Sequence, residues 1–305
     1  MITGTTFVSP NKLQFTLGAL AGLSSVSGEA QSPIAIVVPN DRASVDGTSG
    51  DTAPFVNGAT SVRWQQVYDA SQFLLITPHG GWVGDIVFRL DGECRNGFGT
   101  DVSSLQINLS TTSKTPDGLS SIFAENIGAD DRIVFGPGSL HLVQGCIRGT
   151  SPQPFAMLIP FTTPFYYNPT NGNLLMDIRN YSGGTDPGMN PGLIDGELTT
   201  GDSVSRVDAT DVNASSGIVF SFGLVTLFYF WPNAELSVRL QTNSVVLTWP
   251  ANPDFLLLET SQNVAPQAQW QTITTGIVQN GPAKTLTIPI ESAGKEAYFR
   301  LVSPP

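Results

Sequence analysis

The stretch Phe161-Thr-Thr-Pro-Phe-Tyr-Tyr-Asn-Pro-Thr-Asn-Gly-Asn-Leu-Leu-Met-Asp-Ile-Arg-Asn180 decides the fold class, because it reads as a strand, a turn and a second strand. Residues 165–167 are an aromatic run of the kind enriched in strands, and residues 168–172 are dense in turn formers. Residues 174–179 then pass from an apolar run into alternation, which predicts the second strand of a hairpin. We expect the other strands of a large β-domain to surround this hairpin.

The composition of the chain favours many short strands over helices. Only 13% of the 305 residues are charged, whereas 31 are Gly and 22 are Pro. Apolar residues alternate with a period of two in most runs, and the clearest helical spacing is confined to residues 120–127. This pattern predicts an all-β protein, with a large antiparallel β-sandwich or jelly roll followed by a small β-sandwich. The boundary is expected near Pro232, which gives domains at 31–232 and 233–305.

The first thirty residues resemble a secretory signal peptide. Lys12 precedes an apolar run from Leu13 to Val26, which ends in small residues before Ala30. The alternative is a first strand or helix of the folded domain. No other apolar run reaches the length of a membrane span. We therefore expect a secreted or cell-surface protein whose mature chain does not span a membrane.

Two cysteines, Cys94 and Cys146, fit either one disulfide or two buried free thiols. A disulfide would agree with export, because such bonds persist in oxidising compartments.

The negative charge of the chain limits its partners and suggests a cation site. The net charge is −11 and the 14 Lys and Arg residues form no cluster, so no nucleic-acid partner is expected. Residues 183–217 lose the alternating pattern and are predicted to form a long acidic loop. Its carboxylates could bind Ca²⁺, which accepts six to eight oxygen ligands; the alternative is a solvated surface loop. The candidate ligands are Asp186, Asp195, Glu197 and Asp202.

Aromatic residues near predicted turns are the candidates for ligand binding. Exposed rings at such positions could stack on sugar faces, and the alternative is packing in the core or at a sheet edge. The candidates are Trp82, Tyr166, Tyr167 and Tyr181, together with His79 in the Gly-rich segment before Trp82. Nucleophile-elbow, zinc-protease, P-loop, dinucleotide and EF-hand patterns do not occur in the sequence, so no catalytic residue is predicted.

Two regions resemble known families. Val245-Val-Leu-Thr-Trp-Pro250, Leu258-Glu-Thr-Ser261 and Tyr298-Phe-Arg-Leu301 are similar to the fibronectin type III-like modules that end many secreted bacterial proteins. This resemblance implies a spacer, or a module that contacts carbohydrate. Arg63-Trp-Gln-Gln-Val-Tyr-Asp-Ala-Ser-Gln-Phe73 and Gly172-Asn-Leu-Leu-Met-Asp177 resemble an uncharacterised extracellular β-domain of bacterial proteins that are sorted by a Pro-Glu-Pro C-terminal anchor. That anchor is absent here, so sorting by this route is not expected.

These observations together predict an exported, non-enzymatic protein that recognises a surface or matrix glycan. One alternative is a structural or adhesive extracellular protein that self-associates. Another is a polysaccharide hydrolase or lyase, which would require a cleft with converging carboxylates.

Overall fold

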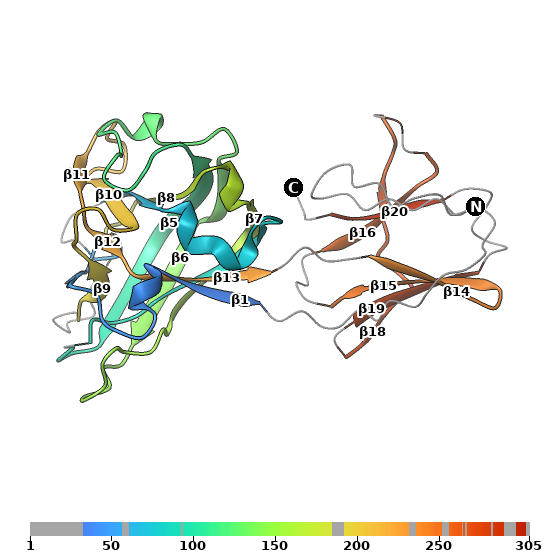
Figure 1. Ribbon diagram of the computed structural model, residues 1–305, viewed down its shortest axis with the longest axis horizontal. Helices are drawn as coiled ribbons and strands as arrows, with labels where there is room; N and C mark the ends of the chain where they lie inside the picture. The colour runs from blue at the N-terminus through green and yellow to red at the C-terminus, as the bar shows by residue number, and fades with distance from the viewer. Residues whose placement is uncertain are drawn as a thin grey trace. The chain divides into compact units, whose positions relative to one another are not determined.

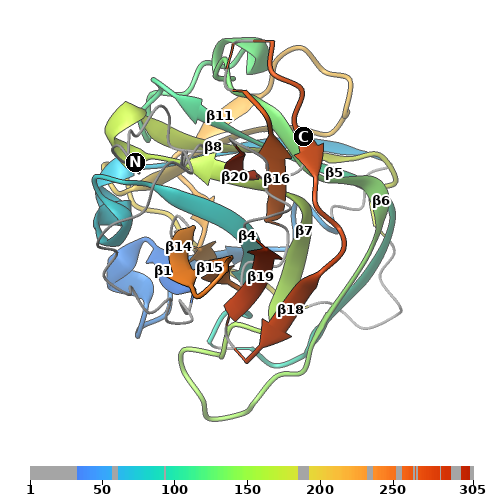
Figure 2. The ribbon, with the colours of Figure 1, turned by 90° about the vertical axis from the view of Figure 1, so that its right-hand side faces the viewer.

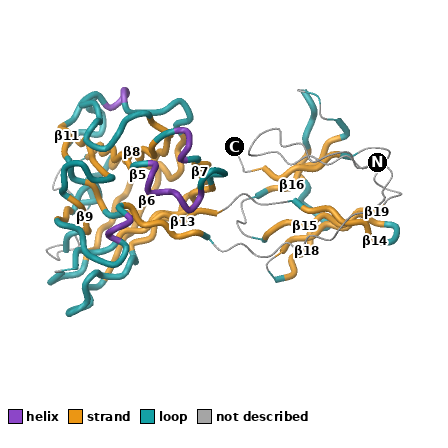
Figure 3. Tube along the Cα trace, viewed as in Figure 1, coloured by secondary structure: helices purple, strands orange, loops and turns teal. Residues whose placement is uncertain are grey.

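The computed structural model describes residues 33–56, 61–92, 94–184, 192–231, 236–251, 256–263, 265, 267–281, 283–289 and 297–302. Its regular structure is almost entirely strand (Figure 3). Every sheet of the described chain contains antiparallel strand pairs. The predicted all-β class is confirmed. The predicted signal segment, residues 1–30, lies outside the described residues.

The chain divides into a larger unit, Ile34–Phe230, and a smaller unit that contains the chain from Trp231 onward (Figure 1). The strands of the larger unit are β1 (Ile34–Val38), β2 (Ser49–Asp51), β3 (Val62–Tyr68), β4 (Gly81–Phe88), β5 (Phe98–Thr112), β6 (Arg132–Gln144), β7 (Met157–Tyr167), β8 (Asn173–Asn180), β9 (Ile194–Glu197), β10 (Val204–Ala209), β11 (Ile218–Phe220), β12 (Gly223–Leu224) and β13 (Thr226–Trp231). They form a four-stranded sheet β1-β13-β4-β7, a six-stranded sheet β11-β10-β3-β8-β5-β6 and a small sheet β12-β9-β2.

One apolar core is shared by the strands of the two main sheets. Alternate residues of β5, Leu105, Ile107 and Leu109, are fully buried in it, as the alternation predicts. The ring of Phe73 lies edge-on to Tyr167 of β7 and to Phe228 of β13, with ring centroids 5.1 Å and 5.6 Å apart. Such edge-to-face contacts stabilise a core beyond the burial of area alone.

The opening stretch forms the two expected strands, but the predicted hairpin is wrong. β7 pairs with β4 in the four-stranded sheet, whereas β8 lies between β3 and β5 in the six-stranded sheet. The turn at residues 168–172 therefore carries the chain from one sheet to the other. Burial explains this arrangement, because β7 and β8 place Tyr167 and Met176 in the same core from opposite sides.

The described helices are short and of the 3₁₀ type: η1 (Asn40–Arg42), η2 (Ala70–Ile76), η3 (Phe123–Glu125) and η4 (Pro169–Asn171). The helix predicted over residues 120–127 is reduced to η3. Asn126 explains the difference, because its side chain accepts from the Ser120 N–H at 2.8 Å and donates to the Ser120 carbonyl at 2.9 Å. Such bonds between side chain and backbone compete with those of a helix.

The long strands β5 and β6 run side by side (Figure 2). A disulfide joins the chain just before β5 to the chain just after β6. β8 pairs with residues 105–112 of β5, so residues 98–102 pair with β6 alone in the described chain. Cys94 and Cys146 are joined, with Sγ atoms 2.09 Å apart and Cα atoms 5.9 Å apart. Of the two states open for these cysteines, the structure shows the disulfide.

The smaller unit also packs two antiparallel sheets. Its strands are β14 (Ser237–Gln241), β15 (Ser244–Pro250), β16 (Leu257–Ser261), β17 (Gln271–Thr272), β18 (Ile277–Asn280), β19 (Ala283–Pro289) and β20 (Tyr298–Val302). They form the sheets β14-β15-β19-β18 and β17-β16-β20. Trp249 lies in the core between them. Trp270 lies outside that core and packs under Arg300, 4.1 Å from ring centroid to guanidinium.

Candidate functional site

Four of the five ligand-binding candidates lie together at one end of β4 and β7. Trp82 pairs with Tyr166 across the two strands, and their ring centroids are 5.3 Å apart. Trp82 is 4% exposed and Tyr167 is fully buried, so for these two rings the structure shows the alternative, packing in the core. Tyr166 is half-buried and hydrogen-bonds to the carbonyl of His79, whose side chain is exposed. A ring without an accessible face cannot stack on a ligand, which leaves His79 and Tyr166 as candidates here.

Tyr181, the fifth candidate, lies apart from this group. It follows β8, is 39% exposed, and its hydroxyl lies 3.5 Å from the side-chain oxygen of Gln106. Its ring remains available to a ligand.

The acidic segment is not the plain loop that the sequence predicts, because it contains β9 and β10. Asp195 and Glu197 are buried side chains of β9, and each is paired with an arginine from another part of the chain. Asp202 lies in the turn after β9, and Asp186 lies outside the described residues. No group of three or more His, Cys, Asp or Glu is arranged to hold a metal ion in the part of the chain that the structure describes. The Ca²⁺ site stays a prediction.

The pair of Asp195 and Arg89 is the most deeply buried ion pair among the described residues. The Arg89 side chain is 1% exposed, and its Nε lies 2.7 Å from Oδ2 of Asp195. Burial raises the pKa of Asp195 to about 6, although Arg89 and the N–H of Gly47 act to lower it. The carboxylate is therefore ionised at neutral pH and faces its counter-charge at hydrogen-bond distance.

Glu197 is held by several donors at once. Arg42 approaches its Oε2 to 2.7 Å, and Thr48 donates to its Oε1 at 2.6 Å. Burial acts to raise the pKa of Glu197, but the bonds from Thr199, Thr48 and Arg42 outweigh it and hold the pKa below its ordinary value. Glu197 thus fixes the N-terminal segment around η1 to β9.

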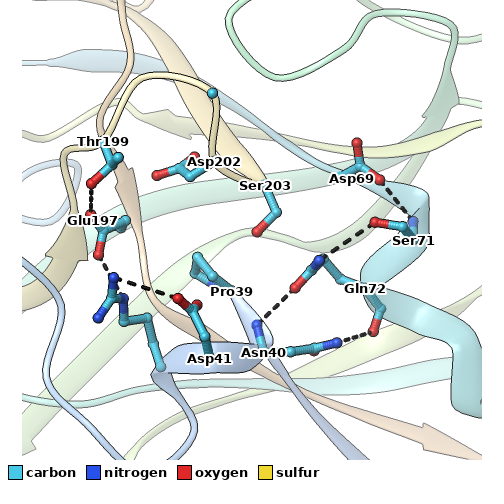
Figure 4. A pocket seen from close by; sticks show the side chains of 12 residues that line it. Pro39, Asn40, Asp41, Asp69, Ser71, Gln72, Glu197, Thr199, Asp202 and Ser203 are labelled. Carbon is cyan, nitrogen blue, oxygen red and sulfur yellow. Dashed lines mark hydrogen bonds and ion pairs between the residues drawn. The ribbon is translucent and has the colours of Figure 1, made fainter.

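A polar pocket of about 550 Å³ opens between η1, η2 and the turn after β9 (Figure 4). Its lining residues are Pro39, Asn40, Asp41, Arg42, Asp69, Ser71, Gln72, Glu197, Thr199, Gly201, Asp202 and Ser203. Figure 4 shows contacts that join Asn40 of η1 to Gln72 of η2, where the backbone N–H of Asn40 donates to Gln72 Oε1 at 2.8 Å. The side chain of Asn40 donates in turn to the Gln72 carbonyl at 3.1 Å. The pocket is therefore a preformed feature built from amides, hydroxyls and carboxylates.

Each wall of the pocket has a local cause in the sequence. Pro39 ends β1 and starts η1, because its ring fixes φ in the range that a helical turn requires. Asp69 caps η2, since its side chain accepts from the Ser71 N–H at 2.8 Å. Asp202 makes the same kind of bond to the N–H of Val204 and begins β10.

Asp202 makes the pocket wall sensitive to pH. Burial raises the pKa of Asp202 to about 6, and the nearby Glu197 and Asp117 carboxylates add to the rise. Because this pKa lies above the ordinary value, the folded state favours the protonated carboxyl, and the free energy of unfolding should fall as pH rises from about 4 to about 6. We expect Asp202→Asn to weaken this dependence and to add about 1 kcal/mol at pH 7.5, after allowance for partial exposure. Urea unfolding at several pH values measures it.

Asp211→Asn is the matched control for that experiment. Asp211 is exposed and makes the same bond to the backbone two residues later, with the Asn213 N–H at 2.9 Å. It shows what the loss of a carboxylate from such a turn does at an exposed position. An Asp202→Asn protein with the wild-type slope between pH 4 and pH 6 would contradict the expectation.

A second, smaller cavity of about 370 Å³ lies over β5 and β6. His141 and Asp101 line it and form an exposed pair, with Nδ1 and Oδ1 2.7 Å apart. Three serines share the cavity, but the hydroxyl of Ser182 accepts from the N–H groups of Ser103 and Ser104 and donates to Asn180 Oδ1. Among the described residues that line this cavity, no serine is bonded to His141 as covalent catalysis would require.

The chain matches no family model, no curated protein and no solved structure. The resemblances of its two regions therefore stay predictions. In the described residues no helix is long and apolar enough to cross a membrane.

Proposed function

We propose that this is an exported, non-enzymatic glycan-binding protein and that the polar pocket beside η1 and η2 is its binding site. The observation that carries the proposal is the lining of the pocket, which combines amide and guanidinium donors with carboxylate, amide and hydroxyl acceptors. Each sugar hydroxyl both donates and accepts a hydrogen bond, so a ligand rich in hydroxyls suits such a lining. The volume lies within the range of small-ligand sites.

The charge of the pocket indicates the class of glycan. Asp41, Asp69, Glu197 and Asp202 line it, against the single cation Arg42. Uronic acids and sulfated sugars would meet repulsion from these carboxylates. The proposed ligand is therefore a neutral glycan.

The contacts that already hold the carboxylate of Glu197 favour binding over hydrolysis as the function of the pocket. A glycosidase needs two carboxyl groups that are free to act on either side of the scissile bond. Arg42 and Thr48 already occupy the two oxygens of Glu197.

A glycan array that covers plant, algal and bacterial polysaccharides tests the proposal. We expect binding to one or more neutral polysaccharides and none to their sulfated or uronic counterparts. Silence across the whole array would refute a glycan-binding function.

Asn40→Ala is expected to weaken binding to the polysaccharide found on the array by about tenfold. The side chain of Asn40 is exposed at the pocket and supplies both a donor and an acceptor, and one lost hydrogen bond corresponds to roughly that factor. Isothermal titration measures the change. Asn213→Ala is the matched control, because Asn213 is equally exposed but lies in the turn after β10.

Tyr181→Ala separates the pocket from a stacking site. If binding depends on Tyr181 and not on Asn40, the glycan lies on the exposed ring and the pocket is not its site.

The disulfide between Cys94 and Cys146 supports the export that the proposal includes, because it requires an oxidising compartment. Fractionation of cells that express the native gene, with detection of the protein outside the cytoplasm, tests this part.

Self-association is a second candidate function, and strand β11 favours it. Ile218, Val219 and Phe220 are all exposed, Ile218 at 66%, and β11 is an edge strand of the six-stranded sheet. An exposed apolar edge strand can pair with the edge of another chain. Size-exclusion chromatography and negative-stain imaging separate the two functions, since a structural role predicts assembly without added sugar. Ile218→Lys should abolish such an assembly.

A further inference from the structure

The segment that forms one wall of the pocket has little to hold it in place by itself. Residues 40–47, here called the rim, include η1 and the connection toward β2. None of their side chains is buried, so apolar packing does not fix them. Asn40, Asp41 and Arg42 of this rim line the pocket. The position of one pocket wall therefore depends on polar contacts.

Several of these contacts come from Arg89, which does not line the pocket. Its Nη2 donates to the rim carbonyls of Arg42 at 2.8 Å and Val45 at 2.7 Å. Its Nε pairs with Asp195, whose other carboxylate oxygen accepts from the Gly47 N–H at 2.9 Å. The two side chains thus hold the rim at three backbone groups, from Arg42 to Gly47.

Arg89 is itself held by further contacts. Its backbone carbonyl accepts from the Asp195 N–H at 2.9 Å, which ties the end of β4 to β9. Its guanidinium lies over the ring of Phe155 at 4.7 Å. A guanidinium that is fixed in this way presents its donors in one orientation, whereas an ammonium would not.

The rim also approaches the backbone of β9 closely at Gly47. A Cβ atom at Gly47 would lie 2.1 Å from the Gly196 carbonyl oxygen, so only glycine fits at this position.

We propose that Arg89 is a positioning residue for the pocket: it holds the rim carbonyls of Arg42 and Val45 and so places Asn40, Asp41 and Arg42 for ligand binding without touching the ligand. This inference deepens the proposed function and rests on it for its effect on binding. Its structural part concerns the rim alone and can be measured without a ligand.

Hydrogen exchange of the full chain tests the structural part first. In the wild-type protein the Gly47 amide should exchange at least tenfold more slowly than the amides of residues 44–46, because it donates to Asp195, whereas the Ala43 amide is left out of the comparison since it donates to the Asn40 carbonyl. Arg89→Lys keeps a positive charge beside Asp195 but loses the forked bonds to the rim. We expect the Gly47 amide to exchange at least tenfold faster in this variant.

Titration with cellohexaose, laminarihexaose and mannohexaose tests the effect on binding. The oligosaccharide that binds the wild-type protein should bind Arg89→Lys at least tenfold more weakly. Arg63→Lys is the matched control, since Arg63 also joins a buried carboxylate, Asp177, to a loop carbonyl, that of Ala214. It should leave rim exchange and binding within twofold of wild type.

Each outcome decides a separate point. If no oligosaccharide binds the wild-type protein, the proposed function loses support, and the exchange rates alone decide the role of Arg89. If the wild-type protein binds and Arg89→Lys binds equally well, the positioning role is refuted. If Arg89→Lys does not fold, Gly47→Ala takes its place in both measurements. The added methyl group must displace the rim, although Arg89 and Asp195 are not substituted. A wild-type Gly47 amide that exchanges as fast as its neighbours also refutes the inference.

Discussion

Replacing Asp195 by alanine is expected to lower the free energy of unfolding by about 3–5 kcal/mol, because it leaves the Arg89 charge buried without a partner. Both side chains are nearly inaccessible, at 1% and 0% exposure. The loss should also remove the bond from the Gly47 N–H. Equilibrium unfolding in urea at pH 7.5 measures the change, provided that one cooperative transition of the larger unit is followed.

The double variant Arg89→Leu and Asp195→Leu is the informative control. It removes both charges together, so we expect it to be more stable than Asp195→Ala, although it lacks the bonds to the rim. Asp101→Ala, which breaks the exposed pair with His141, should change stability little. An Asp195→Ala protein as stable as Asp101→Ala would show that the buried charge has no cost here.

Replacing both Cys94 and Cys146 by serine is expected to cost about 4 kcal/mol. The two cysteines are 52 residues apart, and the bond between them limits the conformations of the unfolded chain. It also ties together the chain beyond the open ends of β5 and β6, where residues 98–102 pair with β6 alone in the described chain. Urea unfolding of both proteins under non-reducing conditions measures the difference.

Dithiothreitol provides the control for this prediction. It should destabilise the wild-type protein to the level of the double serine variant and leave that variant unaffected. If the variant and the wild-type protein unfold at the same urea concentration, the bond does not limit the unfolded chain in the way that the loop entropy requires.

The sequence predicted the strands well where one face of a strand is buried and the other is not. The alternation of β5 places Leu105, Ile107 and Leu109 in the core because a strand turns successive side chains to opposite faces. The same rule does not identify the partner of a strand. Residues 161–180 therefore looked like a hairpin, although the turn between β7 and β8 joins two different sheets. Which sheet a strand enters depends on the packing of the whole core.

The acidic segment is predicted to be a loop because residues 183–217 lose the alternation of apolar and polar residues. Its carboxylates Asp195 and Glu197 find their partners in Arg89 and Arg42, which lie 106 and 155 positions away, distances that no local pattern reveals. Once paired, Asp195 and Glu197 can occupy buried strand positions. The sequence around such a carboxylate shows no hydrophobic periodicity from which its burial could be predicted.

The sequence does not predict the pocket, for a related reason. Its lining comes from three separate segments, near residues 40, 70 and 200, and polar residues in each of these look like ordinary turn residues. Asp69-Ala-Ser-Gln72 carried a usable signal, because an aspartate two residues before a serine can cap a short helical turn. The aromatic residues near turns are the candidates that the sequence offers, yet Trp82 and Tyr167 are buried in the core.

The way in which the arginines are used has a consequence for how the protein meets charged polymers in solution. In the part of the chain that the structure describes, six arginines are paired with carboxylates of their own chain: Arg42, Arg63, Arg89, Arg179, Arg206 and Arg300. These ion pairs neutralise the arginine charges within each unit, so the net charge of −11 determines the electrostatic field outside the protein. A polyanion that diffuses toward the protein is repelled before it can touch any particular site. Added salt should therefore accelerate its arrival, the opposite of its effect on proteins that attract anionic polymers through basic patches.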